Sequence, residues 1–179
     1  MTDDAETGML SATPTISATP TEAHPLPALT ASIAVLIVAL DQLTKRWALS
    51  RLARREPIHV VWTLQFNLTR NSGMAFSKAQ GIGPLIGIGA MLVVLWLAWS
   101  SRKMPGRITA VAAGLIAGGA VGNLCDRLFR GGQLLRGSVI DFIDFQWFPI
   151  FNVADMAIDI GGVVFVLWTV FGYRKARAT

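Results

Sequence analysis

The stretch ITAVAAGLIAGGAVGNLCDRL, residues Ile108–Leu128, decides what kind of fold this chain can adopt. From its start to Gly122 it carries no charged side chain, whereas Asn123, Asp126 and Arg127 cluster at its end. About 20 predominantly apolar residues are enough for a helix to cross the hydrocarbon core of a bilayer. The stretch therefore predicts a membrane-spanning helix with polar side chains at one end.

Three glycines of this stretch, Gly114, Gly118 and Gly122, recur at every fourth position and so share one face of the predicted helix. Lipid tails offer no hydrophobic force that drives helices together, so small residues that let backbones approach are a main source of packing. We expect this helix to be the central one of a bundle.

The rest of the chain offers three similar windows. Of its 179 residues, 53% are apolar and 15% are charged, and its mean hydropathy is +0.50, which favours a membrane protein. The predicted spans are Ala28–Leu49, Ile82–Ser100, Ile108–Leu128 and Phe151–Gly172. The predicted fold is therefore an all-α membrane protein with four transmembrane helices.

The two ends of the chain differ in composition from the spans. Residues 1–27 are rich in Thr, Ala, Ser and Pro and contain no Lys or Arg, which is typical of a disordered tail. A cleaved signal peptide would begin with a basic region, which this tail lacks. Residues 173–179 form a basic tail, so the folded domain is expected to comprise residues 28–172.

Two segments between the spans have the pattern of β-structure. Apolar and polar residues alternate from Val60 to Thr69, which predicts a strand. Val139–Phe145 is a second extended candidate, in which Asp141 and Asp144 would point to opposite faces.

The number of spans predicts where the polar motifs meet. With four spans, the end of the first, the start of the second, the end of the third and the start of the fourth share one membrane face. The motifs on that face are Asp41 to Lys45, Asn71 to Ser77, Asn123 to Arg127, Asp141, and Asn152 to Asp155. We therefore expect one site.

The orientation of this face is a separate question. Lys and Arg are more numerous on this face, and the positive-inside rule alone would place it in the cytoplasm.

The composition also excludes several kinds of site. A single cysteine and two histidines, His24 and His59, argue against a disulfide framework and a zinc site, and we expect no metal and no cofactor. The net charge of +5 comes from residues at the ends of apolar segments, without the basic stripe of a nucleic-acid binder. Membrane lipids with anionic headgroups are the expected partners.

The acidic residues are the best candidates for chemistry. Asn152 and Asp155 could simply cap the last helix, but Asp141 has no such structural reason to stand in an apolar segment. Two carboxyl groups brought close share a proton, so that one can activate water and the other can protonate a leaving amine. Asp141 and Asp155 are the predicted pair, with Asp144 and Asp159 as nearby alternatives.

Other interpretations stay open at this point. Asp41 with Lys45, and the residues Asn123 to Arg127, could form structural ion pairs near a membrane interface. A serine nucleophile would have to recruit Lys45 or Lys78 as its base. Buried charges in spans also mark proton-coupled transporters and channels, and a scaffolding membrane protein would need no chemistry.

The motifs resemble those of the lipoprotein signal peptidases, also called type II signal peptidases. The matching segments, in order, are DQLTK at 41–45, NSGMAFS at 71–77, GGAVGNLCDRL at 118–128, VIDF at 139–142 and FNVAD at 151–155. Met74 departs from the small residue that is common in the family. The resemblance implies a four-helix bundle with a small extracytoplasmic β-like cradle, in a monomer of the bacterial inner membrane whose basic C-terminal tail is cytoplasmic.

The same resemblance implies an activity and a set of site residues. The expected reaction is cleavage of diacylglyceryl-modified prolipoproteins just before the lipidated cysteine, at a site that faces outward, against the charge count. The implied catalytic pair is Asp141 and Asp155. The positions implied to shape the pocket, hold the pair or contact substrate are Asp41, Lys45, Asn71, Gly73, Asn123, Asp126, Arg127 and Asn152.

Overall fold

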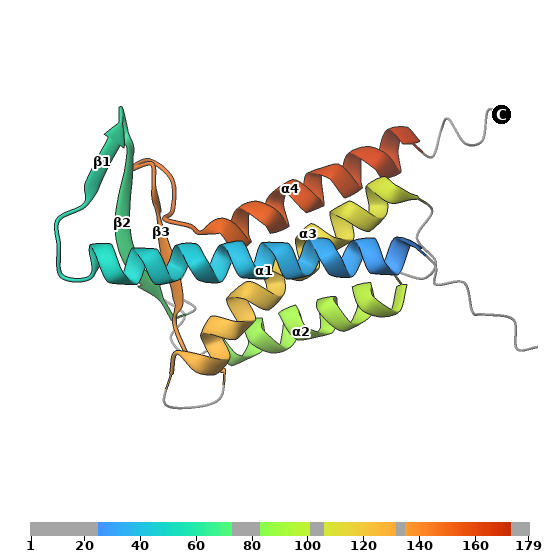
Figure 1. Cartoon of the computed structure of the whole chain (residues 1–179), viewed down its shortest axis with the longest axis horizontal. Coiled ribbons are helices and arrows are strands. Elements are labelled where there is room, and N and C mark those ends of the chain that lie inside the picture. Colours follow the sequence, from blue (N-terminus) through green and yellow to red (C-terminus); the bar gives the residue numbers. More distant parts are fainter. Residues whose placement is uncertain (1–24, 73–82, 101–105, 132–134, 173–179) are drawn as a thin grey trace, which may run out of the picture.

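The computed structural model describes residues 25–72, 83–100, 106–131 and 135–172, in which a helical bundle carries a small sheet at one end (Figure 1). The helices are α1 (Pro25–Leu52), α2 (Gly83–Ser100), α3 (Arg107–Phe129) and α4 (Val153–Leu167), the last continued by a π-helical turn, η2 (Trp168–Gly172). The strands are β1 (Ile58–Val61), β2 (Leu64–Asn71) and β3 (Val139–Asp144).

Three helical segments are long and apolar enough to cross a membrane, namely Leu26–Leu52, Arg107–Phe129 and Val153–Phe171. The apolar part of α2, Pro84–Ser100, is shorter. The predicted membrane class and its first, third and fourth spans are thus supported, whereas a crossing by α2 stays a prediction.

Helix α3 is the centre of the bundle and packs against α1, α2 and α4, as its glycine pattern predicts. A Cβ atom added to Gly118 would lie 2.8 Å from the carbonyl oxygen of Ala34 on α1. One added to Gly119 would collide with the carbonyl oxygen of Ala154 on α4. These close approaches bring the polar ends of α1, α3 and α4 together.

The three strands form one antiparallel sheet in the order β1-β2-β3. The prediction of a single strand from Val60 to Thr69 is wrong, because Val61 pairs with Leu64 and the chain reverses between them. Trp62 adopts a φ of 52° in this turn, a conformation that few side chains favour. The alternation of residue types continues through the turn, so the pattern conceals the reversal.

Strand β3 confirms the second extended segment and links the sheet to α4. The backbone N–H groups of Phe142 and Ile143 both donate to the carbonyl oxygen of Phe151, just before α4. Beneath the sheet, Trp47 of α1 makes edge-to-face contacts with Phe66 and Phe142. The sheet is therefore held on α1 and α4, and the position of β3 is fixed relative to both helices.

Candidate active site

The start of α4 is a capping box that places Asp155. The Asn152 side chain accepts a hydrogen bond from the backbone N–H of Asp155 at 3.0 Å, and the Asp155 carboxylate accepts one from the backbone N–H of Asn152 at 3.2 Å. Each side chain satisfies a helix-terminal donor that would otherwise be unpaired. The capping interpretation is therefore correct, and it leaves the second carboxylate oxygen of Asp155 available for other contacts.

Two asparagines join Asp155 to Asp141. The amide nitrogen of Asn152 donates to Asp141 at 2.6 Å and to the side-chain oxygen of Asn123 at 3.2 Å. Asn123 in turn donates to the free oxygen of Asp155 at 2.7 Å. Asp141 is 3% exposed, so this network fixes a nearly buried carboxyl group next to a second one.

A buried cluster of charges lies behind these residues. The Lys45 ammonium is 2.8 Å from a carboxylate oxygen of Asp41, 2.9 Å from one of Asp126 and 2.9 Å from the side-chain oxygen of Asn123. The side chains of Lys45, Asp41 and Asp126 are 0% exposed. Because Lys45 is held by three acceptors, it is not placed to serve as a free base for a serine.

Each carboxylate of this cluster also holds the backbone of a candidate catalytic segment. Asp41 accepts a hydrogen bond from the N–H of Ala154 at 3.0 Å, one residue before Asp155. Asp126 accepts one from the N–H of Ile140 at 3.1 Å, one residue before Asp141. The ion cluster therefore sets the position of β3 relative to the start of α4.

Sequence reasoning assigned no role to two further members of the cluster, Gln42 and Arg130. The Gln42 amide donates to Asp41 at 3.1 Å and to the carbonyl oxygen of Gly122 at 3.1 Å, and it accepts from Arg130 at 3.3 Å. Arg130 also forms an ion pair with Asp126. The ion pairs of Asp126 are thus with Lys45 and Arg130, not with the adjacent Arg127. The spacing of four between Asp126 and Arg130 is the signal that could have shown this.

The two candidate catalytic aspartates line a cavity of about 340 Å³ between α2, α3, α4 and the sheet. Its lining residues are Asn71, Ile86, Ala90, Val93, Ile116, Ala120, Asn123, Leu124, Arg127, Val139, Asp141, Asp155 and Ile158. Arg127 is 6% exposed, and its Nη1 has no hydrogen-bond partner within the described parts of the chain. The cavity therefore combines apolar walls with carboxyl groups and one unsatisfied guanidinium donor.

The environment of Asp141 favours its protonated form. The pKa of Asp141 is raised from its usual 3.8 to about 6. Burial is the largest cause and the negative charge of Asp155 adds to it, whereas hydrogen bonds from Asn152 and Asn71 and the charge of Lys45 oppose the shift. A carboxyl group that keeps its proton to this pH can act as an acid, and a second carboxylate in the same cavity can act as a base.

The alternative acids have different surroundings. Asp144 points to the opposite face of β3, where it accepts hydrogen bonds from Gln65 at 2.8 Å and Asn67 at 3.0 Å. Burial alone would raise the pKa of Asp144, but these bonds and one from the N–H of Gln146 lower it. Asp159 is exposed on α4. Neither residue lines the cavity.

All the predicted site residues within the described segments meet at this end of the bundle. Gly73 lies outside those segments, as do Ser77 and Lys78. Among the residues described, no three His, Cys, Asp or Glu side chains are grouped as metal ligands.

Comparison with known proteins decides the family. The profile of signal peptidase (SPase) II matches residues 33–171. The chain belongs to the signal peptidase II family. The predicted enzyme class, an aspartic endopeptidase of signal peptidase II type, is thereby confirmed, as is the predicted resemblance.

Individual relatives support the same assignment to the signal peptidase II family. It is 41% identical to a lipoprotein signal peptidase of Mycobacterium avium (strain 104) over 143 residues, 79% of each chain. It is 39% identical to that of Mycobacterium tuberculosis (strain ATCC 25618 / H37Rv), over 79% of this chain and 71% of the relative.

Solved structures agree as well. One bacterial membrane enzyme determined by the in meso method has a TM-score of 0.70 and 28% identity, over 80% of this chain and 94% of the other. A second has a TM-score of 0.68 and 27% identity, over 80% and 88%. The family and these folds support a multi-pass enzyme of a bacterial membrane.

Proposed function

We propose that this chain removes the signal peptide from diacylglyceryl-modified prolipoproteins by cutting just before the lipidated cysteine, with Asp141 and Asp155 as the catalytic pair. The observation that carries this proposal is the hydrogen-bond network through Asn152 and Asn123, which joins both carboxyl groups at the wall of one largely apolar cavity. Family membership supports the substrate class.

In the proposed reaction, Asp155 takes a proton from a water molecule as its oxygen attacks the carbonyl carbon of the scissile bond. Asp141, which burial keeps protonated to about pH 6, gives its proton to the leaving amine nitrogen as the C–N bond breaks. The unpaired Nη1 of Arg127 is available to donate to a substrate oxygen in the cavity. Asn71 and Asn123 hold the pair, and Gly73, which lies outside the described residues, stays a proposed position that shapes the pocket, holds the pair or contacts substrate.

The site is proposed to lie at the membrane surface. Helix α2 would cross the bilayer as a fourth span, and the sheet would form the extracytoplasmic cradle. The lipid chains of the substrate would stay in the bilayer, beside the exposed apolar residues of the helices, while its peptide segment reaches the cavity. Anchoring in the membrane thus orients the substrate before any side chain acts. The enzyme is proposed to act as a monomer.

The test is incubation of the purified protein in detergent with two precursor peptides of the same sequence, one carrying a diacylglyceryl group on its cysteine and one without it. Mass spectrometry of the products should show cleavage before the cysteine of the lipidated peptide alone. Equal cleavage of both peptides would refute the requirement for lipid. Cleavage of neither would refute the proposed reaction.

A further inference from the structure

An exposed apolar surface lies at the end of the sheet that is farthest from the cavity. We call it the apolar tip and define it by its five residues, Val60, Val61 and Trp62 of the β1–β2 hairpin with Trp147 and Phe148 of the β3–α4 loop. All are at least half exposed, and Trp62 is 92% exposed. Several large apolar side chains gathered on a surface mark a contact with something other than water.

The pairing of the strands brings the two parts of the tip together. Val61 pairs with Leu64 at the hairpin turn, and Gln65, the next residue of β2, pairs with Asp144 at the end of β3. The turn and the loop after Asp144 therefore share one end of the sheet. Asn71, which lines the cavity, is at the other end of β2. The tip is thus separate from the candidate active site.

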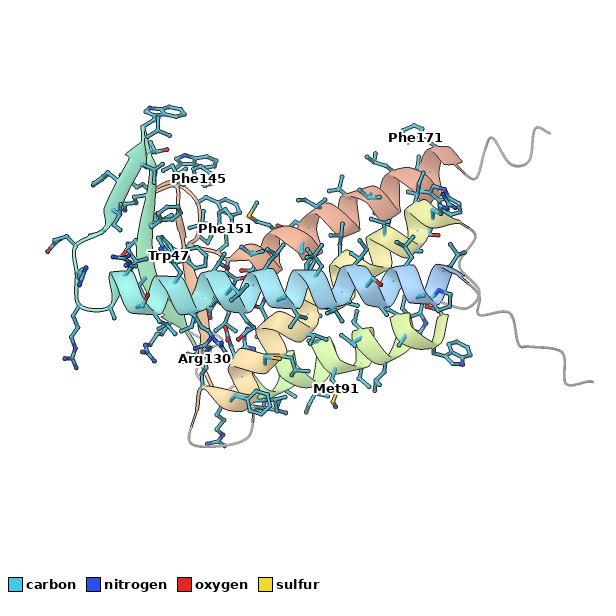
Figure 2. All side chains as sticks on the ribbon, in the orientation of Figure 1. Trp47, Met91, Arg130, Phe145, Phe151 and Phe171 are labelled. Carbon is cyan, nitrogen blue, oxygen red and sulfur yellow. The ribbon has the colours of Figure 1, made fainter. Side chains whose placement is uncertain are left out.

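The β3–α4 loop is held where α4 begins. Phe145 stacks on Phe151 with ring centroids 5.9 Å apart, and Phe148 contacts Phe151 edge to face. Figure 2 shows Phe145 and Phe151 between the sheet and the first turn of α4. Because α4 is a candidate span from Val153 onward, this loop would lie at the level where the chain enters the bilayer.

The direction of the strands shows how the β1–β2 hairpin is oriented relative to the helices. Figure 1 shows the hairpin running across the direction of α1, so that its turn projects beyond the bundle. If the helices cross the bilayer, a sheet in this orientation would lie along the membrane surface, and its projecting turn would lie over lipid. Tryptophan is enriched at such boundaries, because its ring is apolar and its N–H is polar.

The basic residues that precede the hairpin are compatible with a phospholipid surface as its partner. Arg51, Arg54 and Arg55 are exposed at the end of α1 and in the connection to β1. They lie at the start of β1 and the tip at its end, so any attraction of these side chains to anionic lipid headgroups acts over a distance through water. Apolar side chains, tryptophans and arginines together favour a phospholipid surface over water.

We propose that the apolar tip inserts into the interfacial layer of the leaflet on the sheet side of the membrane, with phospholipid as its partner. The tip and the start of α4 then hold the sheet at two points, which fixes the depth of β3 and of Asp141 relative to the bilayer. This placement does not depend on the catalytic roles of the aspartates.

Tryptophan quenching in reconstituted full-length protein tests the proposal. The vesicles contain phosphatidylcholine and phosphatidylglycerol, with phosphatidylcholine brominated either near the carboxyl end or near the methyl end of its acyl chains. The contribution of Trp62 is the emission that Trp62→Phe removes. Glu56→Trp, in the exposed connection before β1, is the matched reference for a ring in water.

We expect the Trp62 emission to be quenched most by bromine near the carboxyl end and to be shielded from aqueous acrylamide, with the reverse result for Glu56→Trp. Quenching of Trp62 by acrylamide but not by brominated lipid would overturn the proposal. Shielding from both quenchers would overturn it too, because a protein surface would then cover the tip. Should Trp62→Phe not fold, Trp147→Phe supplies the same measurement from the other half of the tip.

Discussion

Lys45 is fully buried between two carboxylates, and its charge is tolerable there only because both acids and Asn123 surround it. Buried ion pairs contribute little net stability, but breaking one leaves an uncompensated charge. Here the acids also hold the backbone at Ala154 and Ile140. Loss of Lys45 would therefore affect stability and site geometry together.

Lys45→Met should destabilise the purified protein by roughly 3–5 kcal/mol, because it removes the ion pair of the buried Asp41 and leaves Asp126 paired with Arg130 alone. Thermal unfolding in detergent measures the change. The matched control is Lys45→Met with Asp41→Asn, which removes one charge of each sign and should recover part of the loss. No recovery in the double variant would contradict the charge-balance explanation.

The raised pKa of Asp141 predicts how stability varies with pH. An unfolded aspartate releases its proton near pH 3.8, whereas Asp141 in the folded protein releases it near pH 6. Between these values the folded state binds more protons, so the contribution of Asp141 to stability falls as pH rises and reaches its minimum above pH 6.

Asp141→Asn removes the loss of stability that the ionisation of Asp141 causes as pH rises. The variant should be more stable than the wild type at neutral pH, by at most about 3 kcal/mol for a shift of this size. Unfolding scans at pH 4 and pH 7 should show the advantage at pH 7 and a smaller one at pH 4. Destabilisation at pH 7 would contradict the assigned environment of Asp141.

At this scale the sequence predicts pairs within a helix better than pairs between helices. The spacing of Asp41 and Lys45 predicts their ion pair correctly. The contacts of Lys45 with Asp126 and Asn123 join α1 to α3, and those of Gln42 with Gly122 and Arg130 do the same. Local spacing carries no information on such partners, because they depend on how the helices cross.

At the scale of elements, the glycines of α3 act through close contact with the neighbouring helices. A Cβ atom on Gly118 would lie 2.8 Å from both the Ala34 carbonyl oxygen and the Ile37 Cβ atom, neither of which can move without shifting α1. A Cβ atom on Gly162 of α4 would meet nothing within 4 Å in the described structure. The two positions form a matched pair.

Gly118→Ala should lower the unfolding temperature, since α1 and α3 must separate to admit the methyl group. Gly162→Ala should leave it unchanged or raise it, because alanine is favoured over glycine within helices by up to about 1 kcal/mol. Thermal unfolding of both variants in the same detergent compares them. Equal effects of the two substitutions would contradict the packing role of the α3 glycines.

The sequence predicts the helices better than it predicts the β1–β2 hairpin. Long apolar runs and the glycine repeat predict the helices and the central place of α3, because these signals are local. The hairpin escapes prediction because alternation runs through Trp62 and Thr63, where the chain reverses with a positive φ at Trp62.

At the scale of the whole molecule, the predicted crossing by α2 would give four spans, and the parity of four spans would explain why motifs far apart in sequence meet in one site. The conclusion needs only the topology, whereas the count of basic residues would point the site to the cytoplasm. Arg130 belongs to that count although it lies at the end of α3 (Figure 2), where its guanidinium forms an ion pair with Asp126 and donates a hydrogen bond to Gln42.

Sidedness can be measured with single cysteines. Glu56→Cys, near the sheet, should react with a membrane-impermeant maleimide in intact cells, whereas Arg107→Cys, at the start of α3, should react only after the cells are opened. The wild type, whose one cysteine is the half-buried Cys125, supplies the background. The opposite pattern would place the site in the cytoplasm and contradict the proposed orientation.

Processing of a diacylglyceryl-modified precursor by purified variants in lipid tests the central claim most directly. Asp141→Asn and Asp155→Asn should each abolish cleavage while the proteins insert and unfold cooperatively. Asp144→Asn, a buried acid on the other face of the same strand, should keep it. Cleavage retained by either of the first two variants, or lost equally in the third, would contradict the assignment of Asp141 and Asp155 as the catalytic pair.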